Sequence, residues 1–172
     1  MAPDLPGLMA AQKAIAGKPA WERSNAAYFC LTASLEVDGA TIPGLELRGG
    51  ARQSLPDRAV RMQIQLQPPR GPCIPLARAE WRPTSVHTNK AVGPLELQML
   101  RISETHIHDF DLNWLPEHGR MREGSLPVAR PIRPDLQSFE DFLVFVGQAF
   151  RISNMQKIER PSWQEPGLFG IA

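Results

Sequence analysis

All four histidines of the chain lie in one stretch, at His87, His106, His108 and His118. Histidine titrates near neutral pH, so its side chain can act as a general acid, a general base or a metal ligand. A short strand is predicted over residues 105–112, and on a strand His106 and His108 point to the same face because side chains alternate with period two. The spacing therefore predicts two imidazoles presented together, which suits acid–base catalysis and metal binding alike.

Metal-free cleavage of RNA is the first chemistry that these residues could perform. It needs a base for the 2′-hydroxyl, an acid for the leaving oxygen and a cation near the phosphorus. Arg78 and Arg82 share one face of a predicted strand just upstream, with Glu80 between them. The expected catalytic residues are His87, His106 and His108. The expected substrate-binding residues are Arg78, Arg82 and Asn89.

Metal binding is an alternative that the same histidines allow. His87, His106 and His108 could hold a divalent ion such as zinc, with a carboxylate or water completing the coordination. A His-x-His pair on a strand also resembles the motif of cupin barrels. Cupins place a glutamate a few residues after the pair, whereas this chain has Leu-Asn-Trp at 112–114. No cofactor is expected for RNA cleavage, and a divalent ion is expected for this alternative.

The order of these residues resembles that of a group of small bacterial toxins. Along 78–152 the chain has an arginine-bearing strand, a His-Thr-Asn loop at 87–89, the paired histidines of 106–108 and a closing helix. This order is similar to that of the TumE-type toxins of toxin–antitoxin pairs and of related bacterial families. Those toxins tend to have an acidic–Asn pair after the strand arginine, where this chain has Glu-Trp-Arg at 80–82. The resemblance implies a growth-inhibiting protein that acts on RNA and is neutralised by an antitoxin-like partner.

A non-catalytic interaction domain is the third interpretation. Between Arg48 and Lys90 there are eight basic and two acidic residues, although the net charge of the whole chain is only +1. Arginine makes forked contacts to carboxylates and phosphates, so this basic stretch could contact a protein partner. The histidines would then form only local hydrogen bonds.

The elements that must position these residues are predicted from the spacing of apolar side chains. Helical spacing predicts an N-terminal helix within residues 1–20, which Asp4 can cap. Alternating apolar and polar residues predict strands across 25–115. Asp38 and Gly39 mark a tight hairpin turn, because both residues tolerate a positive φ.

The C-terminal part is predicted to contain one helix and a tail. Apolar residues recur on one face over 138–152, and Ser138 can cap that helix. Residues 153–172 are predicted to form an irregular tail, which packs through Ile158, Trp163 and Phe169.

Together these elements indicate an α+β fold in a single domain spanning residues 1–172. The sheet is expected to be twisted and mainly antiparallel, because its strands alternate instead of being apolar on both faces. The N-terminal and C-terminal helices are expected to pack on one face of this sheet.

The sequence also predicts a cytoplasmic location. No apolar run approaches the roughly 20 residues that span a bilayer, and the first residues lack the basic region of a secretory signal. Cys30 and Cys73 are the only cysteines and are expected to be reduced thiols. We therefore expect no membrane partner, and the sequence leaves the oligomeric state open.

Overall fold

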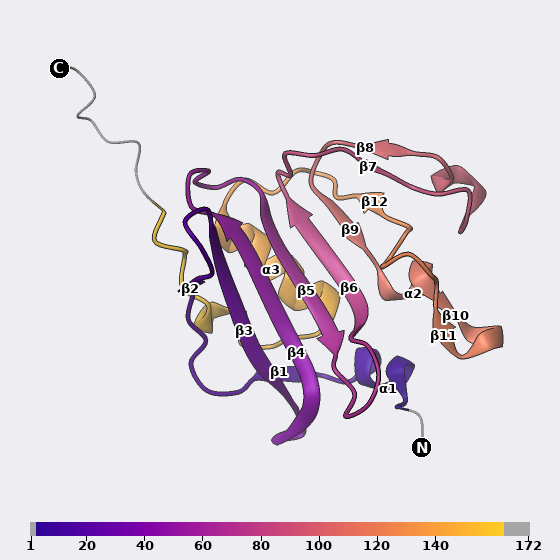
Figure 1. The fold of residues 1–172 in the computed structure, drawn as a ribbon, viewed down its shortest axis with the longest axis horizontal. Coiled ribbons are helices and arrows are strands. Elements are labelled where there is room, and N and C mark those ends of the chain that lie inside the picture. Colours follow the sequence, from indigo (N-terminus) through magenta and orange to yellow (C-terminus); the bar gives the residue numbers. More distant parts are fainter. Residues whose placement is uncertain (1–2, 164–172) are drawn as a thin grey trace.

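An eight-stranded sheet forms the frame of the molecule in the computed structural model, which describes residues 3–163 (Figure 1). Its strands are β1 (Lys13–Ile15), β2 (Glu22–Arg23), β3 (Tyr28–Val37), β4 (Ala40–Arg52), β5 (Val60–Leu66), β6 (Ile74–Trp81), β9 (His106–His108) and β12 (Arg130–Pro131). The strand order is β1-β3-β4-β5-β6-β9-β12, and β2 also pairs with β3.

Neighbouring strands of this sheet all run antiparallel. The β3–β4 hairpin turns at Asp38 and Gly39, whose φ angles are 52° and 76°, as the Asp-Gly pair predicts. Loops over residues 53–59 and 67–73 join β4 to β5 and β5 to β6, and β9 is then added beside β6. The chain order thus brings the predicted arginine strand next to the paired histidines.

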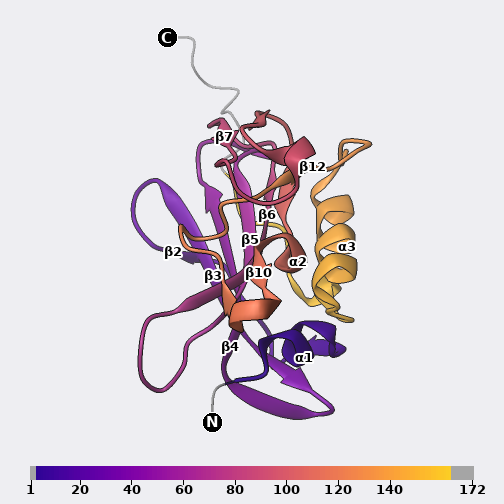
Figure 2. The same ribbon diagram turned by 90° about the vertical axis from the view of Figure 1, so that its right-hand side faces the viewer.

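Helix α3 (Phe139–Phe150) covers one face of the sheet, and α1 (Leu5–Ala10) lies on the same side (Figure 2). Trp81 of β6 is fully buried and stacks on Phe142 of α3, with ring centroids 5.8 Å apart. The α+β class, the mainly antiparallel sheet and the helix near each end are therefore confirmed.

The N-terminal helix is shorter than the predicted range of 1–20. The ammonium group of Lys13 donates hydrogen bonds to the carbonyl oxygens of Leu8, Met9 and Ala11 at 2.8, 3.1 and 2.7 Å. These bonds satisfy the last carbonyls of α1, and the chain then turns into β1. The sheet also extends beyond the predicted range of 25–115, because β12 pairs with β9.

The C-terminal helix begins after a capping box formed by Ser138 and Asp141, and Arg151 follows it with a left-handed φ of 55°. The next residues contain the short 3-10 helix η3 (Met155–Lys157), and Ile158 is buried in the core. Trp163 packs against the same core. Phe169, which was expected to pack as well, lies outside the described residues.

Several short elements surround the end of the sheet formed by β9 and β12. They are β7 (His87–Thr88), η1 (Leu95–Leu97), β8 (Arg101–Ile102), α2 (Phe110–Asn113), β10 (Trp114–Leu115), η2 (Pro116–His118) and β11 (Arg120–Met121). β7 pairs with β8 and β10 pairs with β11, each as a separate two-stranded sheet. Within residues 3–163, no helix is long and apolar enough to cross a bilayer.

Candidate functional site

Three of the four histidines meet at the end of the sheet. The ring centroids of His87 and His108 are 4.6 Å apart, those of His106 and His108 are 5.2 Å apart, and those of His87 and His106 are 5.7 Å apart. β9 supplies His106 and His108, and β7 brings His87 against them. His118 is exposed on η2 and is not part of this cluster.

Strand alternation puts His106 and His108 on the sheet face opposite α3, because Ile107 between them belongs to the core. The two imidazoles were expected to face outward, yet both are fully buried. The segments at 87–89 and 126–129 cover them. A strand pattern reveals which face a side chain occupies, whereas the cover comes from segments distant in the sequence.

β6 adds two charged residues to this cluster. Arg78 is opposite His108 and Glu80 is opposite His106 in the antiparallel register of β6 and β9. Arg78 Nη2 lies 3.1 Å from His108 Nε2, and Arg78 Nε lies 3.0 Å from a Glu80 carboxylate oxygen. The other Glu80 oxygen lies 3.9 Å from His106 Nε2. The register therefore places a cation and a carboxylate beside the two buried imidazoles.

Backbone carbonyl groups determine the tautomers of the β9 histidines. His106 Nδ1 lies 2.8 Å from the Glu104 carbonyl oxygen, and His108 Nδ1 lies 2.7 Å from the Leu126 carbonyl oxygen. A carbonyl oxygen only accepts hydrogen bonds, so both Nδ1 atoms carry a proton and a neutral ring has its lone pair at Nε2. His108 Nε2 accepts from Arg78, whereas His106 Nε2 is buried without a hydrogen-bond partner.

Asn89 positions His87 from inside the protein. Its side-chain amide donates to the carbonyl oxygens of Leu97 and Ala129, each at 2.8 Å, and its Oδ1 accepts from the Ala129 backbone N–H. The orientation of the amide is therefore fixed, and Oδ1 accepts from His87 Nε2 at 2.9 Å. Asn89 was expected to contact substrate, but it is only 1% exposed and is instead a support for His87.

Burial determines the charge of two of the imidazoles. Desolvation, reinforced by the nearby Arg78 charge, lowers the pKa of His108 to about 2. Desolvation also lowers the pKa of His87, although the hydrogen bond to Asn89 opposes the shift. Both rings are therefore neutral at pH 7. Burial lowers the pKa of Arg78 as well, and Glu80 opposes that shift; a guanidinium nevertheless keeps its charge at neutral pH.

Arg82, which was expected to bind substrate beside Arg78, lies elsewhere. β6 ends at Trp81, and Arg82 has a left-handed φ of 45°, so the strand alternation stops before it. Its guanidinium lies over the Trp81 ring at 5.0 Å and donates to the carbonyl oxygens of Leu136 and Gln137. Its role is to connect β6 to the segment that precedes α3.

Glu80 also belongs to the site, although the sequence indicates it only as a residue between Arg78 and Arg82. Its carboxylate, His106 and His108 offer ligand atoms that all lie within 4.8 Å of one another. The metal set expected from the sequence contained His87 in place of this carboxylate. The signal for Glu80 was its position two residues after Arg78, which puts both side chains on the histidine face.

Solvent reaches the cluster on the side of Glu80. That side chain is 23% exposed and lines a cavity of about 200 Å³ together with Tyr28, Arg61 and Ser85. A substrate atom in this cavity can therefore approach Glu80 directly. His87 is partly exposed beside the cavity but does not line it, and His106 and His108 are buried.

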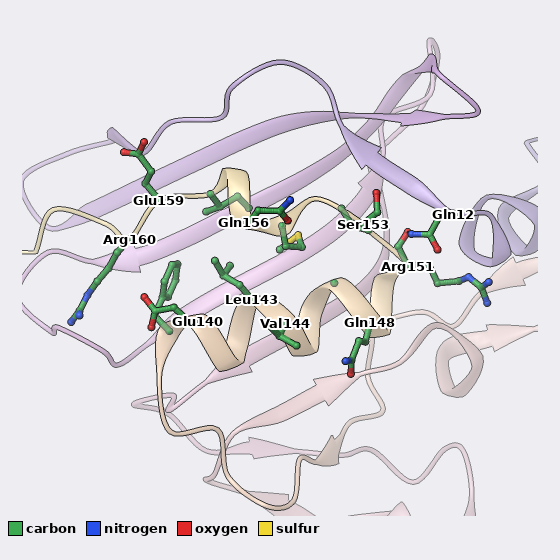
Figure 3. Close-up of a pocket in the computed structure, with 15 residues that line it drawn as sticks. Gln12, Glu140, Leu143, Val144, Gln148, Arg151, Ser153, Gln156, Glu159 and Arg160 are labelled. Carbon is green, nitrogen blue, oxygen red and sulfur yellow. The ribbon is translucent and has the colours of Figure 1, made fainter.

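A separate cavity of about 860 Å³ runs along α3 on the other side of the sheet (Figure 3). Its walls include Leu143 and Val144 of α3 and Met155 of η3, with Gln12 and Arg151 at the rim. The residues of the histidine cluster do not contribute to it. Of the cluster, Glu80 faces the smaller and more polar cavity.

Comparison of the chain with protein-family models, with curated proteins and with solved structures found no match. The geometry of the cluster is therefore the basis on which a function can be assigned.

Proposed function

We propose that this protein cleaves RNA without a metal ion, through a site formed by Arg78, Glu80, His87 and His106. The observation that supports this proposal is the position of Arg78. Its guanidinium lies between His108 Nε2 and the Glu80 carboxylate, so a permanent cation already stands at the centre of the cluster. A guanidinium offers a fork of N–H donors that matches a phosphate group.

Arg78 would stabilise the negative charge on the non-bridging phosphoryl oxygens during cleavage. Its side chain is 15% exposed, and low local dielectric strengthens its attraction to an anion. His108 acts as a positioning residue, because its neutral Nε2 accepts a hydrogen bond from Arg78 and directs the guanidinium.

His87 is the proposed general base. Its lowered pKa keeps it neutral at pH 7, and its Nε2 proton is donated to Asn89, so a proton can be accepted only at Nδ1. A hydrogen bond to the Pro127 backbone carbonyl favours the protonated ring. The proton would come from the 2′-hydroxyl of the ribose, whose oxygen then attacks the adjacent phosphorus. The products of this attack are a 2′,3′-cyclic phosphate and a leaving 5′-oxygen.

Glu80 and His106 together are the proposed general acid. The carboxylate faces the cavity, and its second oxygen is 3.9 Å from the unpartnered His106 Nε2. In the protonated form of the site, the Glu80 carboxyl group would deliver its proton to the leaving 5′-oxygen, and a proton taken up from solvent would restore that form after each cleavage. His106 would thus act through Glu80, since the imidazole itself is fully buried.

The test is cleavage of a labelled single-stranded RNA by purified protein in the presence of EDTA. We expect products that end in a 2′,3′-cyclic phosphate, and no cleavage at a linkage whose 2′-hydroxyl is replaced by hydrogen. His87→Ala should lower the rate about 10²- to 10⁴-fold, because it removes a proton-transfer group. His118→Ala is the matched control, since His118 is exposed outside the cluster. Absence of cleavage by the wild type, or an equal loss in both variants, would contradict the proposal.

Metal binding is the second candidate, and one observation favours it. His106 and His108 each donate Nδ1–H to a backbone carbonyl, which is the usual support of a metal-binding imidazole. With Glu80 they would offer two nitrogens and one carboxylate to a divalent ion such as zinc. Arg78 argues against this, because an ion there would displace or repel the guanidinium. One bound zinc per chain, lost in His106→Ala, together with cleavage that EDTA abolishes, would favour the metal candidate.

The resemblance to TumE-type toxins extends the proposal to the cell. It supports cytoplasmic RNA as the substrate and an antitoxin-like protein as the partner. Induced expression in a bacterium should arrest growth, and the double variant His87→Ala/His106→Ala should not. If wild type and double variant leave growth and RNA equally intact, the third interpretation, a non-catalytic interaction domain, takes precedence.

A further inference from the structure

The face of the sheet that α3 leaves uncovered carries polar side chains in ordered rows. It is the face turned to the viewer in Figure 1, with α3 behind the strands. The register of β3, β4, β5, β6 and β9 aligns one residue from each strand in every row. The first row is Cys30, Gly50, Arg61, Glu80 and His106. The second row is Thr32, Arg48, Gln63, Arg78 and His108.

Both rows end at the proposed site. The first leads across β4 and β5 to Glu80, and the second leads to Arg78. A molecule that lies across the strands on this face would therefore reach the reacting groups at one end. The rest of that molecule would contact the side chains of β3, β4 and β5.

Two cavities make this face concave. The cavity of about 200 Å³ that reaches Glu80 and a second of about 390 Å³ share three lining residues, Tyr28, Gly50 and Arg61. The second cavity continues to Arg48 and Gln63. We call the two together the open-face groove. Because they share residues, the two cavities lie side by side between the middle of β4 and the proposed site.

Gly50 leaves the bottom of the groove without a side chain. A Cβ atom at this position would have Arg61 Nε and Nη2 as its nearest neighbours, both 3.9 Å away. Core packing therefore does not require glycine here. The neighbouring Gly49 differs, because its Cβ would come within 2.8 Å of Trp21 on the core side. A glycine inside a strand without a packing reason is typical of a place where a ligand approaches the backbone.

The groove carries positive charge and one exposed aromatic ring. Arg48, Arg52 and Arg61 are exposed, and the ion pairs found within residues 3–163 involve none of them. Tyr28 is 40% exposed, and the Arg52 guanidinium lies over its ring at 5.3 Å. Arginines beside an aromatic ring are the combination that proteins use to hold a phosphate backbone and to stack an unpaired base.

We propose that the open-face groove binds the single-stranded RNA segment that flanks the cleaved phosphate. Arg48 and Arg61 contact its phosphates, and Tyr28 with Arg52 stacks on a base. This inference rests on the proposed function, because RNA is the substrate in both. A base must be unpaired to stack on a protein ring, so the groove selects single strands over duplexes.

Binding can be measured separately from cleavage with a fluorescent 2′-O-methyl RNA, whose blocked 2′-oxygen cannot attack. Fluorescence anisotropy should show that Gly50→Leu weakens binding at least tenfold, because the new side chain fills the groove. Gly50→Ala adds only a methyl group to the bottom of the groove and should weaken binding less than Gly50→Leu does. Val144→Leu, an exposed change on α3 behind the sheet, is the control and should bind as the wild type does. Arg48→Ala/Arg61→Ala should weaken binding at least tenfold and reduce its dependence on salt concentration.

The same measurements distinguish this inference from the proposed function. His87→Ala should bind the 2′-O-methyl RNA normally while losing cleavage. Wild-type binding without cleavage would overturn the proposed function and leave the groove supported. Cleavage with unchanged binding in Gly50→Leu and in the double arginine variant would overturn the groove. Equal binding of a duplex would also overturn it. Thermal unfolding of each variant confirms that it is folded.

Discussion

His108 shows how a single neutral residue can organise a charged site. It is fully buried and gives its Nδ1 proton to the Leu126 carbonyl, so its only free atom is the Nε2 lone pair that meets Arg78. A protonated ring would lose that lone pair and would place a second positive charge beside the guanidinium. The arrangement of Arg78 therefore depends on His108 remaining neutral.

This dependence predicts a loss of stability in acid. Burial lowers the pKa of His108 from its ordinary value of 6.5 to about 2, so below pH 6.5 the unfolded chain binds a proton that the folded protein excludes. Its contribution is fully present above pH 6.5 and decreases by up to about 1.4 kcal/mol for each pH unit below it. Urea unfolding at pH 7.5, 6 and 5 measures this slope. His108→Gln should flatten it, and His118→Gln should not. Parallel slopes in wild type and His108→Gln would refute the link.

At the level of the elements, strand alternation was the most informative part of the sequence. It correctly separated Ile107, in the core, from His106 and His108, because a period of two is a local property of the chain. Alternation does not predict that Arg82 leaves the face of β6 that carries Arg78. This departure depends on one left-handed φ angle and on carbonyls more than fifty residues away.

Contacts between distant segments account for the other differences. Arg78 and His108 are 30 residues apart, and Asn89 and Ala129 are 40 residues apart. The register that joins the first pair, and the cover that buries Asn89, both require knowledge of which strands are neighbours. Sequence spacing supplied the residue types of the site, while the role of Glu80 and the support by Asn89 came only from the assembled sheet.

Helix α1 depends on one lysine from the following strand. Lys13 is 1% exposed and donates to three carbonyl oxygens at the end of the helix. In Lys13→Met these carbonyls lose their partners inside the protein, so we expect the free energy of unfolding to fall by at least about 2 kcal/mol. Lys18→Met is the control, because the Lys18 side chain is 83% exposed. Urea unfolding at pH 7 compares the two variants, and equal stabilities would show that the three bonds have no net effect.

At the scale of the whole molecule, the two ends of the described chain are joined. Asn154 Oδ1 accepts from the Ile15 backbone N–H at 2.7 Å, and its side-chain amide donates to the Ile15 carbonyl at 3.1 Å. The backbone of Lys13 also forms an isolated parallel β-bridge with Ile152. The segment after α3 therefore acts as a further partner for the edge strand β1.

This closure predicts that Asn154 stabilises the molecule as a unit. Asn154→Ala removes both bonds to Ile15 and should lower the free energy of unfolding by about 1–3 kcal/mol. The loss should appear as one cooperative transition at a lower temperature, by circular dichroism and by tryptophan fluorescence alike. Gln156→Ala, an exposed change two residues later, should have no effect. Separate transitions in the two signals would indicate that the ends unfold independently.

The segment at 126–129, which helps to bury the histidines, is synthesised after the histidines themselves, so the site can form only late in synthesis. His87 and Asn89 leave the ribosome before Leu126 and Ala129, whose backbone groups hold His108 and the Asn89 amide. A nascent chain that ends before Leu126 therefore lacks the carbonyl that orients His108 and the backbone N–H that holds the Asn89 amide. Under the proposed function, an unfinished polypeptide could not cleave the messenger RNA from which it is being translated. The site would become active only late in translation.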